Sequence, residues 1–194
     1  MKNGKSILLV GVGGQGILLA SEVISQAAMI QGFDVKKSEI HGMSQRGGVV
    51  SSHVRYGEHI YSPLIGKASA DVLLSFEKVE SYRWIEYLRP GGEVITNTTE
   101  IVPPAVYAMG KEYPHDVIDR MHKQGVNVLA VDAASVAKGV GNVRAMNVVL
   151  LGVLSRKLSF PDETWQEALR ARVPKRHLEV NLNAFKEGQR LAAS

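Results

Sequence analysis

The chain has 194 residues, of which 45% are hydrophobic and 22% are charged. This length suits one domain, and the composition supplies a sizeable core and excludes a disordered chain. The net charge of +4 comes from 23 basic and 19 acidic residues that are dispersed along the sequence, and aromatic residues make up only 6%. A nucleic-acid partner is therefore not expected, since such proteins usually carry a basic stripe with interleaved aromatics.

Cysteine is absent. The chain therefore has no disulfide, no thiol nucleophile and no cysteine-ligated iron–sulfur cluster of its own. No apolar run approaches the roughly 18 residues that a membrane span needs. The first residues, MKNGKSILLV, run directly into a glycine-rich loop without a cleavable signal. We expect a cytoplasmic protein with no membrane partner.

Strand-like and helical segments alternate along the first two thirds of the chain. Short apolar or alternating runs predict strands at residues 7–10, 33–40, 49–56, 71–76, 93–96 and 126–131. Helical spacing predicts helices at residues 17–31, 77–88 and 115–123, the second of them ended by Arg89-Pro90-Gly91-Gly92. The alternation predicts an α/β protein with a Rossmann-like, doubly wound and mostly parallel sheet.

The last third is helical by pattern. Residues 142–158 are apolar nearly all round and predict a buried helix. Ser159-Phe160-Pro161-Asp162 resembles a capping box that would open a helix through Arg172. A final amphipathic helix after Pro174 carries Leu178, Leu182 and Phe185. We expect these C-terminal helices to pack on the sheet, so that residues 1–194 form a single domain.

A glycine loop follows the first predicted strand and matches the pattern G-x-G-x-x-G. Its candidate ligand- or anion-binding residues are Gly11, Gly13, Gly14, Gln15 and Gly16. Glycines let the backbone approach an anion, and a helix N-terminus offers unpaired N–H donors. A dinucleotide would also need an acid after the second strand, where Glu39 is available, whereas Lys36 and Lys37 suit a phosphate. The glycines are equally compatible with close helix–sheet packing alone.

A second polar loop interrupts two strand-like runs. Its candidate residues are His41, Gly42, Ser44, Gln45, Arg46, Gly47 and Gly48. The loop lies beyond the carboxyl end of the second predicted strand, where open parallel sheets bind ligands and partners. It fails the serine-hydrolase elbow pattern because Arg46 stands at the final glycine position. The alternative is a glycine-rich connection with solvated polar groups.

Other candidate sites are weak. The six histidines show no metal-ligand spacing, so no metal site is predicted. We expect Asn147 to cap a helix or hydrogen-bond a buried neighbour, with a ligand-binding role as the alternative. Asp71 and Glu77 flank a predicted strand, and we expect helix capping there, with an active-site carboxylate as the alternative.

The two loops together resemble a known family. GVGGQGI followed by SEIHGMSQRGGVVSSHVR is similar to the gamma-type subunit of 2-oxoacid:ferredoxin oxidoreductases, and within that group to the beta subunit of indolepyruvate ferredoxin oxidoreductases. The resemblance continues through ADVLLSFEKVE, LRPGGEVITNT and GNVRAMNVVLLGVL, so it covers most of the chain. The glycine loop alone is unspecific, but its combination with HGMSQRGG at this spacing is specific.

The resemblance implies an oxidative decarboxylation of a 2-oxoacid, such as an arylpyruvate, to an acyl-CoA with electrons passed to ferredoxin. Such enzymes use thiamine diphosphate, iron–sulfur clusters and CoA. This chain has no cysteine and no GDG-type thiamine diphosphate motif. The resemblance therefore places these centres in a larger partner subunit. It makes residues 1–194 a pyruvate/ketoisovalerate oxidoreductase gamma-type domain that binds no cofactor alone.

Two other functions remain open from the sequence. One is an autonomous NAD(P)-binding dehydrogenase, for which no convincing Tyr-Lys or His-Asp acid/base pair is present. The other is a non-catalytic scaffolding module. Binding of NADH or NADPH by the isolated chain would favour the first.

Overall fold

The computed structural model describes residues 4–41, 48–102 and 112–192. A six-stranded sheet in the order β2-β3-β1-β4-β5-β6 forms its centre. The strands are β1 (Lys5–Val12), β2 (Asp34–His41), β3 (Val49–Gly57), β4 (Ala70–Ser75), β5 (Leu88–Asn97) and β6 (Asn127–Val131). The pairs β1–β4, β4–β5 and β5–β6 are parallel, whereas β3 is antiparallel to both β1 and β2. Five of the strands thus point the same way, which confirms the mostly parallel sheet.

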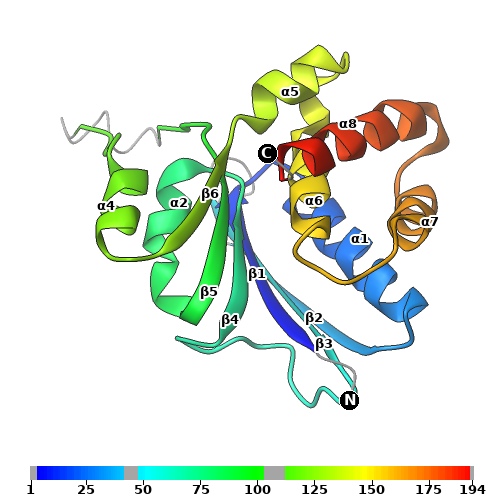
Figure 1. Cartoon of the computed structure of the whole chain (residues 1–194), viewed down its shortest axis with the longest axis horizontal. Coiled ribbons are helices and arrows are strands. Elements are labelled where there is room, and N and C mark those ends of the chain that lie inside the picture. The colour runs from blue at the N-terminus through cyan, green and yellow to red at the C-terminus, as the bar shows by residue number, and fades with distance from the viewer. Residues whose placement is uncertain (1–3, 42–47, 103–111, 193–194) are drawn as a thin grey trace.

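Helices cover both faces of this sheet (Figure 1). On one face lie α1 (Ile17–Ile30), α5 (Ala133–Gly139), α6 (Met146–Ser155), α7 (Asp162–Arg172) and α8 (Leu178–Leu191). On the other lie α2 (Lys78–Arg83) and α4 (Val117–Lys123). The predicted doubly wound α/β architecture with C-terminal helices is therefore confirmed. No helix in the described ranges is both long and apolar enough to cross a bilayer.

Helix α6 is buried on every side from Asn147 to Ser155, which explains its almost uniformly apolar sequence. Its close partner is α8. A Cβ added at Gly152 would lie 2.1 Å from the carbonyl oxygen of Phe185, and one at Gly188 would lie 2.0 Å from that of Val149. The two helix backbones therefore meet where neither has a side chain.

Three local predictions need correction. Residues 77–88 are not one helix, because α2 ends at Arg83, a 3-10 turn spans Ile85–Tyr87, and β5 already begins at Leu88. The β4–β5 ladder pairs Ala70 with Leu88 but Val72 with Glu93, so the glycine-containing segment between them bulges out of register instead of stopping a helix.

The capping box was also wrong. Helix α7 begins at Asp162 with Pro161 as its N-cap, and no side chain caps its first turn. Asp162 instead accepts a hydrogen bond from Gln189 at 2.8 Å. Helix α5 was missed, although Asp132 is a standard N-cap whose carboxylate accepts from the Ser135 N–H at 3.0 Å.

Candidate functional site

The carboxyl ends of five strands lie at one edge of the sheet, and both candidate loops lie there. The glycine loop follows β1, and the second loop joins the end of β2 to the start of β3. The Gly13 N–H donates to the carbonyl oxygen of Gly48 at 2.9 Å, so the two loops are in direct contact. His41 closes β2 opposite Val50. Predicted site residues Gly42, Ser44, Gln45, Arg46 and Gly47 lie outside the described residues.

The interior of the glycine loop is filled by its own glutamine. Gln15 is buried, its Oε1 accepts from the Val12 N–H at 2.7 Å, and its Nε2 donates to the carbonyl oxygen of Phe76 at 2.7 Å. A Cβ at Gly11 would lie 2.7 Å from Gln15 Oε1 and 2.9 Å from Phe76 Cβ. Gly11 therefore serves the packing of this loop against β4.

The last glycine of the loop begins helix α1. Gly16 has φ of +79°, and an added Cβ would lie 2.4 Å from the Nδ2 of Asn147. Asn147 donates to the Gly16 carbonyl oxygen at 3.1 Å and accepts from the Val148 N–H at 2.9 Å. This confirms the predicted hydrogen-bonding role of Asn147. Gly14, with φ of +101°, has nothing within 4 Å of an added Cβ and is the open part of the loop.

A third buried amide, Asn97 at the end of β5, was missed from the sequence. Its Nδ2 donates to the Phe76 carbonyl oxygen at 3.3 Å, and its Oδ1 accepts from the Ala133 N–H at 3.2 Å. Gln15, Asn97 and Asn147, here called the amide triad, thus connect the loops after β1, β4, β5 and β6 with the start of α6. Only its position in ITNT, directly at a predicted strand end, pointed to Asn97.

Glu77 caps α2, as expected, and also fixes a longer segment. Its carboxylate accepts from the Glu80 N–H at 2.9 Å, from the Ile101 N–H at 3.1 Å and from the Tyr113 hydroxyl. Burial and the nearby Glu77 carboxylate raise the pKa of Tyr113, so its hydroxyl stays protonated and can donate. Glu77 therefore has a structural role, because its carboxylate accepts three hydrogen bonds that tie α2 to the segment after β5 and to Tyr113.

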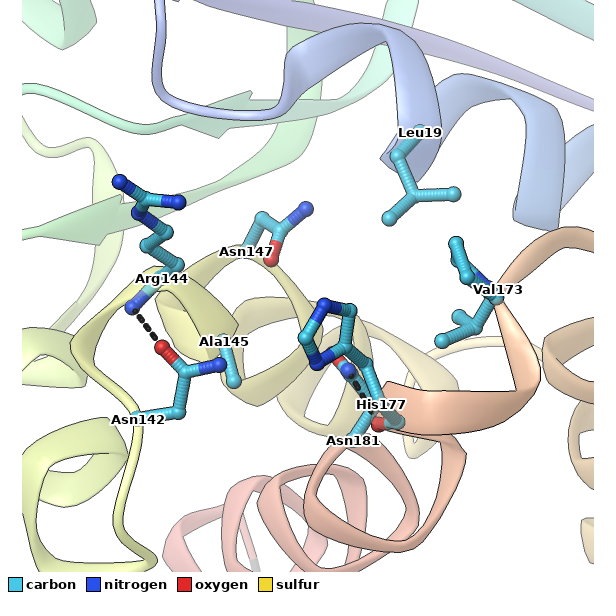
Figure 2. Close-up of a pocket in the computed structure, with 9 residues that line it drawn as sticks. Leu19, Asn142, Arg144, Ala145, Asn147, Val173, His177 and Asn181 are labelled. Atoms are coloured by element: carbon cyan, nitrogen blue, oxygen red, sulfur yellow. Dashed lines mark hydrogen bonds between the residues drawn. The ribbon is translucent and has the colours of Figure 1, made fainter.

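A cavity of about 380 Å³ opens beside Asn147, between α1, the start of α6 and the start of α8 (Figure 2). It is lined by Leu19, Asn142, Arg144, Ala145, Asn147, Val173, Pro174, His177 and Asn181. None of these is acidic, and within the described ranges the guanidinium of Arg144 has no carboxylate within ion-pair distance. The backbone N–H of Arg144 is held by the Asn142 side chain at 3.0 Å. Sequence reasoning did not identify this cavity, because its lining comes from three separated stretches of the chain.

The dinucleotide hypothesis finds little support in this geometry. Gln15 and Asn147 occupy the space around the first and last glycines. The carboxylate of Glu39, the candidate ribose ligand, already accepts hydrogen bonds from the Lys37 ammonium at 2.8 Å and from the Ser21 hydroxyl at 3.5 Å. In the described part of the chain, no group of three acidic or histidine side chains is placed to hold a metal ion.

The structure is thus a doubly wound α/β domain whose carboxyl edge is held by buried amides and carries two joined loops. The chain belongs to the pyruvate ferredoxin/flavodoxin oxidoreductase family, whose model matches residues 6–191. It is 43% identical over 195 residues to the indolepyruvate oxidoreductase subunit IorB of Thermococcus kodakarensis, with 96% of this chain and 95% of the relative covered. The resemblance to this family is thereby confirmed.

Solved structures share the fold. The gamma subunit of a keto/oxoacid ferredoxin oxidoreductase from Geobacter sulfurreducens superposes with a TM-score of 0.72 at 24% identity, covering 97% of this chain and 98% of its own. The 2-oxoglutarate:ferredoxin oxidoreductase of Magnetococcus marinus, with 2-oxoglutarate, coenzyme A and succinyl-CoA bound, gives a TM-score of 0.76 at 23% identity. That match covers all of this chain and 32% of the longer one.

Proposed function

We propose that residues 1–194 form the small gamma-type subunit of a cytoplasmic 2-oxoacid:ferredoxin oxidoreductase that acts on an arylpyruvate such as indolepyruvate. The observation that carries this proposal is the 43% identity to an IorB subunit over nearly the whole of both chains. In this assignment, a larger partner subunit holds thiamine diphosphate and the iron–sulfur clusters, and ferredoxin accepts the electrons. The lack of any cysteine supports this division, because a cluster needs thiolate ligands.

The carboxyl edge of the sheet is the part of this chain proposed to face the partner. The loop between β2 and β3 belongs to it through the Gly13–Gly48 hydrogen bond, and so does the cavity beside Asn147. Arg144, without an acidic partner among the described residues, suits an anionic group such as a phosphate of CoA. The chain's own contribution is to bind and orient, since the amide triad fixes the loops that would meet the partner.

The division of labour can be tested with the purified chain. We expect it to be colourless and unable to reduce an artificial electron acceptor with any 2-oxoacid, and to gain turnover when the partner subunit is added. Turnover by rigorously partner-free protein would contradict the proposal. Tight binding of NADH or NADPH by the isolated chain would instead support the dehydrogenase alternative.

Arg46 is the residue to test in the loop between β2 and β3. A planar guanidinium can bind a carboxylate or phosphate in a bidentate manner, and loss of an arginine buried in a contact costs about 2 kcal/mol or more. We expect Arg46→Ala to fold normally by circular dichroism but to weaken assembly of the reconstituted complex by tenfold or more. Arg170→Ala, on the exposed side of α7, is the matched control. Assembly and turnover like the parent would show that this loop is ordinary surface.

A further inference from the structure

A second cavity lies at the opposite, amino-terminal edge of the sheet, away from the candidate site. It has a volume of about 660 Å³ and is formed by the start of β1, the end of β3 and the connection from α6 to α7. This volume lies within the range of small-molecule sites, roughly 300–1,000 Å³. Gly4, Gln31 and Phe33 also line the cavity, and none of its lining residues carries a carboxylate.

One wall of this cavity is aromatic. The ring centroids of Phe33 and Tyr56 lie 5.0 Å apart in an edge-to-face arrangement, and Phe160 lies 5.2 Å from Tyr56 and 5.9 Å from Phe33. Rings at these distances form a firm apolar surface against which another flat ring can pack. The wall therefore favours a ligand with an aromatic ring.

Polar donors stand next to this wall. Tyr56 has a relative exposure of only 3%, and its hydroxyl, which has no hydrogen-bond partner among the described residues, keeps contact with solvent. Burial raises the pKa of Tyr56, so the hydroxyl keeps its proton and remains a donor. The Ser159 hydroxyl is a second donor on the lining. The Tyr56 and Ser159 hydroxyls are therefore available to donate to an acceptor of a ligand in the cavity.

Two lysines supply positive charge. The Lys157 ammonium pairs with Glu93 at 2.8 Å, whereas Lys5 lies 3.9 Å from Asp71. Asp71 already accepts from Arg89 at 2.8 Å and from the Ser6 N–H at 2.8 Å. Lys5 is therefore only weakly engaged and is the cation most available to an anionic ligand.

From these observations we infer that the cavity is a binding site for a small aromatic carboxylate, whose ring packs on Phe33 and Phe160 and whose carboxylate meets Lys5 and the Tyr56 hydroxyl. A ring without a charge would leave Lys5 and Tyr56 unused, and an acid without a ring would leave the aromatic wall exposed to water. The site is separate from the edge assigned to the partner subunit and does not depend on the proposed function.

The test uses the full chain with four probes: indole-3-acetate, phenylacetate, benzyl alcohol, which lacks the charge, and acetate, which lacks the ring. Calorimetry should show saturable one-to-one binding of the two aromatic acids and at least tenfold weaker binding of the other two. Amide chemical shifts should move at Gly4, Tyr56 and Ser159. Shifts confined to Asn147 and its cavity would overturn the assignment.

Two variants locate the anchors. Lys5→Gln should weaken indole-3-acetate about tenfold, and Phe160→Leu should weaken it by a similar factor while keeping the site apolar. Lys36→Gln is the matched control, because Lys36 is an exposed lysine on β2 outside the cavity. Absence of saturable binding, equal binding by Lys5→Gln, or benzyl alcohol binding as tightly as phenylacetate would overturn the inference. If Phe160→Leu fails to fold, Lys5→Gln and the probe series still decide.

Discussion

Gly16 and Asn147 offer a direct test of how the glycine loop is held. At Gly16 an alanine would carry the cost of a left-handed backbone, about 1–2 kcal/mol. Its Cβ would also lie 2.4 Å from the Nδ2 of a buried Asn147, which would have to move and lose its 3.1 Å bond to the Gly16 carbonyl. That loss adds about 1 kcal/mol or more. We therefore expect Gly16→Ala to lower the free energy of unfolding by about 2–3 kcal/mol in total.

Gly14→Ala is the matched control, since Gly14 also has positive φ but nothing within 4 Å of an added Cβ. It should carry the backbone cost alone. The free energies are measured by urea unfolding of the full chain, followed by circular dichroism. In an Asn147→Ala background, the cost of Gly16→Ala should fall to that of Gly14→Ala. If Gly16→Ala costs no more than Gly14→Ala, or costs the same with and without Asn147, the contact does not hold the loop.

Two further predictions concern stability. Gly152→Ala should destabilise the chain by about 2 kcal/mol or more because its Cβ would meet the Phe185 carbonyl at 2.1 Å. Gly139→Ala, in open space at the end of α5, should be neutral or slightly stabilising, and equal urea midpoints for the two variants would contradict this. Burial lowers the pKa of His53 below its ordinary 6.5. Between the native pKa and about pH 6.5 the unfolded chain binds a proton at His53 that the folded chain does not bind. The free energy of unfolding should therefore be unaffected by His53 above about pH 6.5, and it should fall as the pH drops from there towards the native pKa. Unfolding midpoints measured against pH should show this slope, and His53→Gln should remove it.

Much of the fold could be predicted from the sequence, because periodic apolar runs report which side of an element is buried. Helix α6 was recognisable since residues 148–154 are apolar without interruption. The failures have local causes. The β5 segment through Pro90 and Gly91 carries turn residues, but tertiary pairing with β4 makes it a strand with a bulge.

The candidate site was predictable in part. The glycine loop and Asn147 could be identified because short motifs mark them, but their use could not. Whether Gln15 points outward to a ligand or inward to Val12 depends on Phe76, which is 61 residues further along the chain. The cavity beside Asn147 gave no local signal at all, because its lining runs from Leu19 to Asn181.

The reversed direction of β3 has a consequence for how such a subunit can diverge. Because β3 runs back antiparallel, the connection from β2 both leaves and re-enters the sheet at the carboxyl edge. Loops of this kind accept changes in length and sequence without disturbing strand register or helix packing. The connection between His41 and Val49 is therefore a natural unit of exchange. We predict that transplanting it between related subunits would leave the strand register and the helix packing of the domain intact.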